Sequence, residues 1–235
     1  MLGERIFRLV TNVTCVVLLY KILLQEDCNF LHILLGGNQR DPLYYHNYPC
    51  LAIPRNLDDF YIFKLSYHLY ELFYSVAYQR KRSDFPEYFL HHLMTWSLIF
   101  FSYSLNMLTQ GSIVMLVHDV TDLSVTIFKL TIDVTPIAVQ AVGYFSMLAS
   151  WIYFRIWFFP CYIIYKLYEE CYGGNICKNV NYSMLNMLFA FISGLACLHI
   201  FWLYLMLKGM LRRLSSRKAL IDGVSLSSSE NKTET

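Results

Sequence analysis

Charged residues are scarce in this sequence, and their scarcity excludes the most common class of protein. Asp, Glu, Lys and Arg make up 15% of the 235 residues, whereas hydrophobic residues make up 56%. A soluble domain of this length needs more charge to cover its surface, so the composition indicates an integral membrane protein. The formal net charge of +2 is too small to indicate nucleic acid as a partner.

Sequence patterns typical of several other classes are also missing. The seven cysteines form neither a CxxC pair nor a zinc-ligand spacing. Cys171 and Cys177 share one short polar segment, where a disulfide can form if that segment faces an oxidising lumen. The sequence contains no GxSxG nucleophile elbow and no internal repeat. We expect no cleavable signal peptide, because the first apolar run is long and contains Arg8.

Apolar stretches long enough to cross a membrane dominate the chain. A spanning helix needs about 20 residues, and six stretches qualify: 6–24, 57–78, 88–108, 111–131, 134–168 and 184–209. Pro160 is expected to kink or break the fifth stretch, because proline lacks a backbone donor. We therefore predict an all-α, polytopic membrane protein with a bundle of about six transmembrane helices in residues 1–212. Residues 213–235 are predicted to form a disordered, Ser-rich cytosolic tail.

The distribution of basic residues predicts the orientation in the membrane. Placing the N-terminus in the cytosol puts Arg5, residues 80–82 (RKR) and the basic cluster at 208–218 on the cytosolic side. This arrangement satisfies the tendency of Lys and Arg to remain in cytosolic segments. Both termini are then predicted to lie in the cytosol.

Polar residues nevertheless lie inside two of the apolar stretches. In the fourth, they recur at intervals of four, four and three residues and so share one helix face: His118, Asp122, Thr126 and Lys129, with Asp119 bordering that face. The third stretch carries His91, His92, Thr95, Ser102, Tyr103 and Asn106. Because the connecting segment is short, we predict antiparallel neighbours whose polar residues meet in the cytosolic half of the bundle. Ionisable residues at such depth usually mark a functional site.

Less specific interpretations apply to some of these residues. Thr95, Ser102 and Asn106 are also the residue types that form hydrogen bonds between membrane helices. Lys129 lies near a helix end and can extend its amine to the lipid headgroups. We interpret His68 and His199, which lie apart from the polar face, as packing residues.

Acyl transfer suits the remaining histidines and aspartates better than metal chemistry. Only three of the seven histidines are placed where they could bind a metal together, and two carboxylates are too few ligands for a cation site. We therefore predict no metal. An imidazole can act as a base or as a nucleophile that carries an acyl group. A carboxylate can hold its tautomer and stabilise the imidazolium.

The stretch HHLMTWSLIFFSYSLNMLTQGSIVMLVHDVTD, residues 91–122, resembles the signature of ceramide synthases, the acyltransferase branch of the TLC-domain membrane proteins. The matching residues are His91, His92, Thr95, Ser102, Tyr103, Gly111, His118, Asp119 and Asp122. The resemblance extends to NYP at 47–49, RKRSDF at 80–85 and RIWFFP at 155–160. Two positions differ: this chain has Thr109 where the family usually has Arg, and Thr126 where it usually has Glu.

The resemblance implies an enzyme of the endoplasmic reticulum membrane that joins the acyl group of a fatty acyl-CoA to the amine of a sphingoid base. It implies catalytic roles for His91, His92, His118, Asp119 and Asp122. It implies substrate-binding roles for Thr95, Ser102, Tyr103, Asn106 and Arg155. Acyl-CoA enters as substrate and no other cofactor is expected. The partners are then the two substrates and the lipid bilayer, and the family also allows a homo- or hetero-dimer.

Two alternative functions remain open at the level of sequence. One is a non-catalytic TLC-domain protein that binds or traffics lipids. The other is a proton-coupled transporter, against which the small size and the lack of an inverted repeat argue. For the acyltransferase, we predict that His91 carries the acyl group and that Asp122 stabilises its imidazolium. Direct attack of the amine on the thioester, with a histidine as base, is the rival route.

Overall fold

The structure, a computed structural model, describes residues 2–25, 31–45, 48, 53–81, 84–132, 135–174, 177 and 180–233. At positions 2, 4, 213–214 and 216–233 it describes the backbone alone. The chain divides into two compact units, Met1–Leu198 and His199–Thr235. The first unit contains the helical bundle, and its parts are described below.

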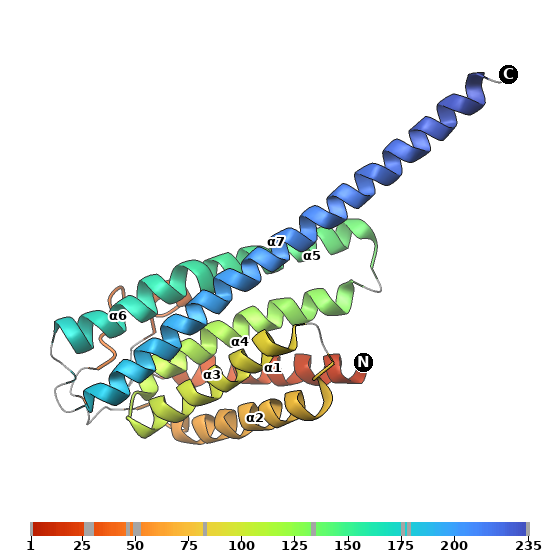
Figure 1. Cartoon of the computed structure of the whole chain (residues 1–235). Coiled ribbons are helices and arrows are strands. Elements are labelled where there is room, and N and C mark those ends of the chain that lie inside the picture. Colours follow the sequence, from red (N-terminus) through yellow and green to blue (C-terminus); the bar gives the residue numbers. More distant parts are fainter. Residues whose placement is uncertain are drawn as a thin grey trace. The chain divides into compact units, whose positions relative to one another are not determined.

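Every apolar stretch predicted to span the membrane forms a helix (Figure 1). The first four helices are α1 (Leu2–Leu23), α2 (Leu57–Tyr78), α3 (Phe85–Ser104) and α4 (Leu108–Thr131). A short 3-10 turn, η1, covers Ile33–Leu35. Three helices, at Arg5–Leu23, Ile137–Gly173 and Tyr182–Arg212, are long and apolar enough to cross a membrane by length and composition. The described part of the chain thus confirms an all-α, multi-pass membrane protein.

The fifth stretch is one continuous helical segment despite its proline. It comprises α5 (Ile137–Trp151), the π-helix η2 (Ile152–Ile164), α6 (Tyr165–Tyr168) and the π-helix η3 (Glu169–Gly173). Pro160 lies inside η2, so the predicted break is wrong, whereas the predicted kink stays a prediction. The wider hydrogen-bonding pattern of a π-helix accommodates the residue that an α-helix would exclude.

Helix α4 occupies the centre of the first unit. It packs against α1, α3, α5 and η2, while α2 packs on α3. Gly111, at the start of α4, allows Tyr61 of α2 and Ser102 of α3 to lie close to the α4 backbone. A Cβ atom at this position would collide with the Tyr61 hydroxyl and lie 2.8 Å from Ser102 Oγ. Such contacts between small residues hold membrane helices together where burial in lipid gives little driving force. They also confirm that α3 and α4 are neighbours.

The last helix, α7, extends over Tyr182–Thr233. Within the first unit its buried side chains recur at helical spacing: Leu185, Leu188, Ile192 and Leu195. Phe191 of this helix stacks with Phe101 of α3, with ring centroids 6.3 Å apart. The backbone of residues 213–233 continues α7, where the sequence predicted a disordered tail. The division into a domain at 1–212 and a tail at 213–235 stays a prediction.

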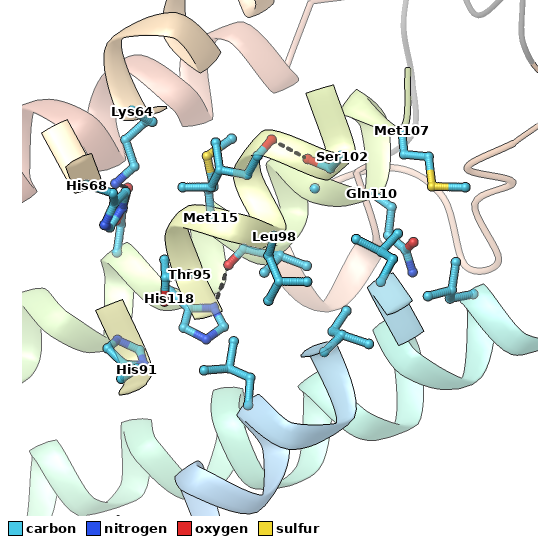
Figure 2. Close-up of a pocket in the computed structure, with 18 of the residues that line it drawn as sticks. Lys64, His68, His91, Thr95, Leu98, Ser102, Met107, Gln110, Met115 and His118 are labelled. Atoms are coloured by element: carbon cyan, nitrogen blue, oxygen red, sulfur yellow. Dashed lines mark hydrogen bonds and ion pairs between the residues drawn. The ribbon is translucent and has the colours of Figure 1, made fainter. Parts of the chain in front are cut away.

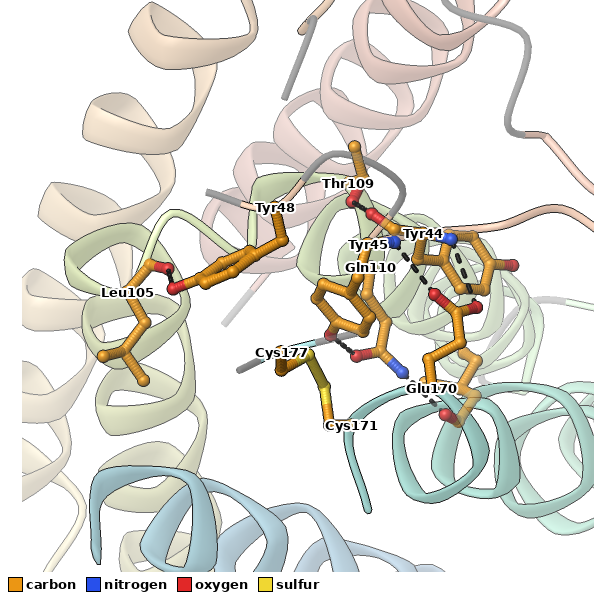
Figure 3. The surroundings of a disulfide bond; sticks show 10 residues. Tyr44, Tyr45, Tyr48, Leu105, Thr109, Gln110, Glu170, Cys171 and Cys177 are labelled. Carbon is orange, nitrogen blue, oxygen red and sulfur yellow. Dashed lines mark hydrogen bonds between the residues drawn. A yellow bond between two sulfur atoms is a disulfide. The ribbon is translucent and has the colours of Figure 1, made fainter. Parts of the chain in front are cut away.

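Residues 31–45 form a segment that is fastened to η3 and to the start of α4 (Figure 3). The Glu170 carboxylate accepts hydrogen bonds from the backbone N–H groups of Tyr44 and Tyr45, at 3.2 and 2.9 Å. Thr109 Oγ1 donates to the Tyr44 carbonyl at 2.6 Å. The Cys171–Cys177 disulfide, which the sequence allowed on condition of an oxidising environment, is formed in the structure.

Candidate functional site

A cavity inside the first unit collects most of the polar residues identified from the sequence. Its empty space, including the solvent-open mouth, is ≈ 720 Å³. Helices α2, α3, α4, α6 and α7 and the segment at Tyr45 all contribute to its wall. The cavity therefore lies between helices that are distant in sequence.

The two ends of the cavity differ in chemistry (Figure 2). We call one end the polar end, defined by Lys64, His68, His91, Thr95, His118, Asp119 and Asp122. We call the opposite end the Tyr45 end, defined by Tyr45, Met107 and Gln110. Apolar side chains such as Leu98, Ile99, Leu188 and Ile192 line the space between them. A molecule with a reactive head and an apolar body matches this division.

The histidine pair of α3 is split between the cavity and the protein interior. His91 lines the cavity. His92 is buried outside the lining, and its ring lies edge-on to Tyr88 with centroids 4.3 Å apart. Consecutive residues on an α-helix point about 100° apart, so the two rings cannot face the same space. The two rings contact each other, with centroids 5.5 Å apart, which gives His92 a supporting position behind His91.

His118 has a defined hydrogen-bonding partner. Its Nδ1 lies 2.7 Å from the Val114 carbonyl oxygen, one turn earlier on α4. Because a carbonyl only accepts hydrogen bonds, we infer that Nδ1 carries the proton and that Nε2 is the basic nitrogen. The ring also packs edge-on against Phe159, with centroids 5.3 Å apart. His118 is thus held in one ring orientation by the hydrogen bond and the ring contact.

Asp119 is paired with a lysine that sequence reasoning did not connect to it. Lys64 Nζ of α2 lies 2.7 and 3.0 Å from the two carboxylate oxygens of Asp119. Both side chains are buried and both line the cavity. Removing one member of a buried ion pair leaves an uncompensated charge, which typically costs about 3–5 kcal/mol. The pair therefore fixes α2 against α4 at the polar end.

Asp122 is paired with Arg155 of η2 in the same manner. Arg155 Nη2 donates to the Asp122 carboxylate and also lies 3.3 Å from the His118 carbonyl oxygen. The guanidinium stacks over the Trp151 ring at 4.3 Å, and its side chain is 2% exposed, against 47% for Asp122. Arg155 is absent from the cavity lining, so it affects the cavity through Asp122. Both carboxylates of the α4 motif are therefore matched by cations from other helices.

The structure also places the remaining predicted residues. Thr95 and Ser102 line the cavity. Thr95 Oγ1 is buried and has no hydrogen-bond partner within the described part of the chain. Ser102 Oγ donates to the Ile99 carbonyl at 3.2 Å and lies 3.3 Å from the Tyr61 hydroxyl. Their roles as substrate-binding residues stay predictions.

Tyr103 and Asn106 lie outside the cavity lining, although the sequence placed them on or beside the polar face. Tyr103 is exposed, and its ring is 6.0 Å from that of Tyr61. Asn106 follows the end of α3 and has a φ of 55°, a conformation that asparagine tolerates better than most residues. For Asn106 the prediction extended the helical face past Ser104, where α3 ends.

His68, interpreted from the sequence as a packing residue, lies in the cavity wall. It lines the cavity, one turn along α2 from Lys64. Its Nδ1 is buried and has no hydrogen-bond partner among the residues that the structure describes. The spacing of four residues between Lys64 and His68 could have indicated this position, because such residues share a helix face.

Among the described residues, no three His, Cys, Asp or Glu side chains are grouped as metal ligands.

The two threonines that distinguish this chain from the ceramide synthase signature both make internal hydrogen bonds. Thr109 donates to the Tyr44 carbonyl at the Tyr45 end. Thr126 Oγ1 donates to the Asp122 carbonyl at 2.7 Å and accepts from Asn12 Nδ2 of α1 at 3.4 Å. Neither threonine lines the cavity. The two differences from the family signature therefore leave the polar residues of the cavity unchanged.

Sequence comparisons place the chain among known membrane proteins. Residues 2–208 match the family model described as the TLC domain. Ceramide synthase 4 of Bos taurus is 33% identical over 163 residues, which cover 69% of this chain and 40% of the relative. Ceramide synthase LOH1 of Arabidopsis thaliana is 27% identical over 182 residues, 75% of this chain and 58% of the relative. The chain thus spans about half the length of these relatives.

Proposed function

The chain belongs to the TLC-domain family of membrane proteins, and we propose that it is a ceramide synthase. The reaction transfers a fatty acyl group from acyl-CoA to the amine of a sphingoid long-chain base and forms an amide. The observation that carries the proposal is the shared cavity, which unites His91 of α3 with His118, Asp119 and Asp122 of α4. These are the residues by which the sequence resembles ceramide synthases.

The shape of the cavity supports this substrate class. Both substrates combine a polar reactive group with a long apolar chain, and the cavity has a polar end that continues into an apolar space. Arg80 and Lys81 are exposed in the connection before α3, the helix that carries His91. Positive charges there can attract the anionic head of coenzyme A. In the proposed orientation this end faces the cytosol, both termini are cytosolic, and the membrane is that of the endoplasmic reticulum.

The geometry suggests distinct roles for the histidines and the carboxylates. Asp119 and Asp122 are engaged by Lys64 and Arg155, so we assign them to electrostatic support. The basic nitrogens of the cavity are then those of its imidazoles. We propose that His91 accepts the acyl group or acts as the base, and that His118 assists. No cofactor besides the substrate acyl-CoA is required by this scheme.

Purified protein in detergent or lipid discs, incubated with acyl-CoA and a sphingoid base, tests the proposal. Ceramide measured by mass spectrometry is the expected product, and its formation should be lost in a His91→Ala variant. The matched control is His32→Ala, since His32 lies outside this cavity. Lipid binding without ceramide formation by the wild-type protein would instead favour a non-catalytic lipid-binding member of the family.

A second measurement separates the two chemical routes. Protein is incubated with acyl-CoA alone, and its intact mass is determined after rapid quenching. An acyl-sized adduct that is absent from His91→Ala supports a covalent acyl-histidine. Ceramide synthesis without any adduct limits His91 to the role of a base.

A further inference from the structure

We propose that His68 of α2 is a further catalytic residue, which accepts the proton of the attacking amine and returns it to the leaving thiolate. The inference rests on the proposed acyl transfer and assigns a residue outside the α3 and α4 motif. It begins from the position of His68, which lines the polar end of the cavity together with His91 and His118 (Figure 2).

The free ring nitrogen of His68 is the first observation. His68 Nδ1 is buried and has no hydrogen-bond partner among the described residues. His118 Nδ1, in contrast, lies against the Val114 carbonyl at 2.7 Å. Burying a polar nitrogen without a partner is unfavourable, and a ligand group in the cavity can supply the missing partner. An amine that approaches the polar end is such a group.

The carboxylates of the cavity are poorly suited to the same task. Both oxygens of Asp119 accept from Lys64, and Asp122 accepts from Arg155. Protonating either carboxylate would leave a buried cation without its counter-charge, which is strongly unfavourable. An imidazole can take up a proton without breaking either pair. Proton transfer in this cavity is therefore assigned to a histidine.

Lys64 acts here as a positioning residue. It lies four residues before His68, so both project from one face of α2. Its bonds to Asp119 tie that face to α4. The Tyr67 ring supports His68 from its own helix, edge-on with centroids 5.6 Å apart. These contacts hold the His68 ring at the cavity wall.

The proposed step balances without a further reactant. The neutral amine nitrogen attacks the acyl carbonyl carbon, a C–N bond forms, and the C–S bond of the thioester breaks. Coenzyme A leaves as a thiolate. The proton lost by the nitrogen passes to His68 and then to the thiolate, so the products are an amide and a free thiol. If the acyl group is first transferred to His91, the proton released by that imidazole passes to the thiolate, which leaves as a free thiol. In the second step the amine displaces His91 from the acyl carbon, and His68 passes the amine proton to the departing imidazole.

Other titratable groups surround His68 and bear on any pH measurement. From α2, α3 and α4 these groups are Lys64, His91, His92 and His118, which interact with the ring electrostatically, and Asp119 and Asp122, which line the same end of the cavity. Arg8 of α1 is occupied by an ion pair with Glu71, at 2.9 Å. A change in the pH profile must therefore be assigned by comparing variants.

The test compares His68→Gln with the wild-type protein, using acyl-CoA and sphingoid base. Gln retains hydrogen bonding but cannot accept a proton near neutral pH. Loss of a general base predicts about 10²–10⁴-fold slower turnover, with the KM for acyl-CoA unchanged. The loss should shrink as pH rises, because hydroxide increasingly removes the proton from the nitrogen of the addition intermediate in place of His68. His32→Gln, which changes a histidine outside the cavity, is the matched control and should keep the turnover of the wild-type protein.

A His68→Ala variant supplies a second measurement in case the glutamine variant misfolds. Added imidazole should restore part of its turnover by filling the vacated space, an effect that a purely structural role of His68 would not produce. Unchanged turnover in His68→Gln would overturn the inference. So would a pH-independent loss without imidazole rescue. An inactive wild-type protein would instead reject the proposed function, and the assignment of His68 with it.

Discussion

The two ends of the cavity differ in how completely their polar groups find partners. At the Tyr45 end, the Tyr45 hydroxyl donates to Gln110 Oε1, and Gln110 Nε2 donates to the Ile163 carbonyl at 2.6 Å. Burial raises the pKa of Tyr45 well above its usual value, which keeps the phenol protonated as a donor. At the polar end, His68 Nδ1 and Thr95 Oγ1 are buried and have no partner among the described residues.

This difference separates stability from function. A saturated network makes one rigid arrangement, because each group would lose its partner on moving. Unsatisfied groups in a cavity reduce stability but remain available to a ligand. Changes at the polar end should therefore act mainly on turnover, and changes at the Tyr45 end mainly on stability. The four predictions below test that separation, beginning with the largest expected effect.

Replacing His91 with Ala tests the functional end most directly. Loss of the base or nucleophile predicts a decrease in turnover of about 10²–10⁴-fold, measured as ceramide formed per enzyme. The unfolding temperature should change little, since His91 is only partly buried and faces the cavity. Equal losses of folded protein and of activity would show that the two ends do not differ in this way.

Replacing Lys64 with Met should reduce stability although Lys64 lies at the polar end, because the change leaves the buried Asp119 carboxylate without its counter-charge. The predicted loss is about 3–5 kcal/mol in the free energy of unfolding, measured by denaturant titration in detergent. The double variant Lys64→Met with Asp119→Leu should recover most of that stability, since no buried charge remains. A double variant as unstable as the single one would contradict the ion-pair explanation.

Replacing Tyr45 with Phe tests the structural end. The change removes one hydroxyl and leaves Gln110 Oε1 without its donor, which should reduce stability by about 1–3 kcal/mol. Turnover of the folded fraction should remain at the wild-type level. Tyr48→Phe is a suitable control, because Tyr48 donates to a less buried acceptor, the Leu105 carbonyl. A large decrease in turnover for Tyr45→Phe would extend the functional site to this end.

The smallest expected effect is the pH dependence that arises from His32, in the segment at 31–45. Burial lowers the pKa of this imidazole, and contacts with Arg40 and Asp41 oppose the shift only in part. The unfolded chain then binds more protons than the folded one, so stability increases with pH. Its contribution is complete above the ordinary pKa of about 6.5 and is lost as pH falls through the lowered value. His32→Gln should flatten this slope in unfolding measurements.

Some parts of this structure follow from local sequence patterns. Apolar run length predicted the helices, and the spacing of His118, Asp119 and Asp122 predicted one helix face beside His91. The short turn at residues 105–107 forces α3 and α4 together, so their adjacency was also predictable. These features depend on residues that are near one another in the chain.

Other parts depend on which distant segments meet, and local patterns do not specify this. Lys64 and Asp119 are 55 residues apart, and Asp122 and Arg155 are 33 apart. Their pairing requires the packing of α2 and η2 around α4, which no periodicity within one helix can show. The position of His68 in the cavity wall was not predicted for the same reason. The π-helix at Pro160 was also not predicted, because apolar run length does not distinguish it from an α-helix.

The two ion pairs on α4 have one more consequence, which concerns electrical balance. Lys64 offsets Asp119 and Arg155 offsets Asp122 within the protein itself, so these four groups contribute no net charge to the cavity. A small ion is not needed to accompany them when the cavity is empty. In the proposed reaction, an uncharged acyl chain would then enter, and an uncharged amide would leave, without moving a counter-ion across the low-dielectric bundle. Binding of the apolar chain should accordingly be insensitive to ionic strength, and only the anionic coenzyme A head should respond to salt.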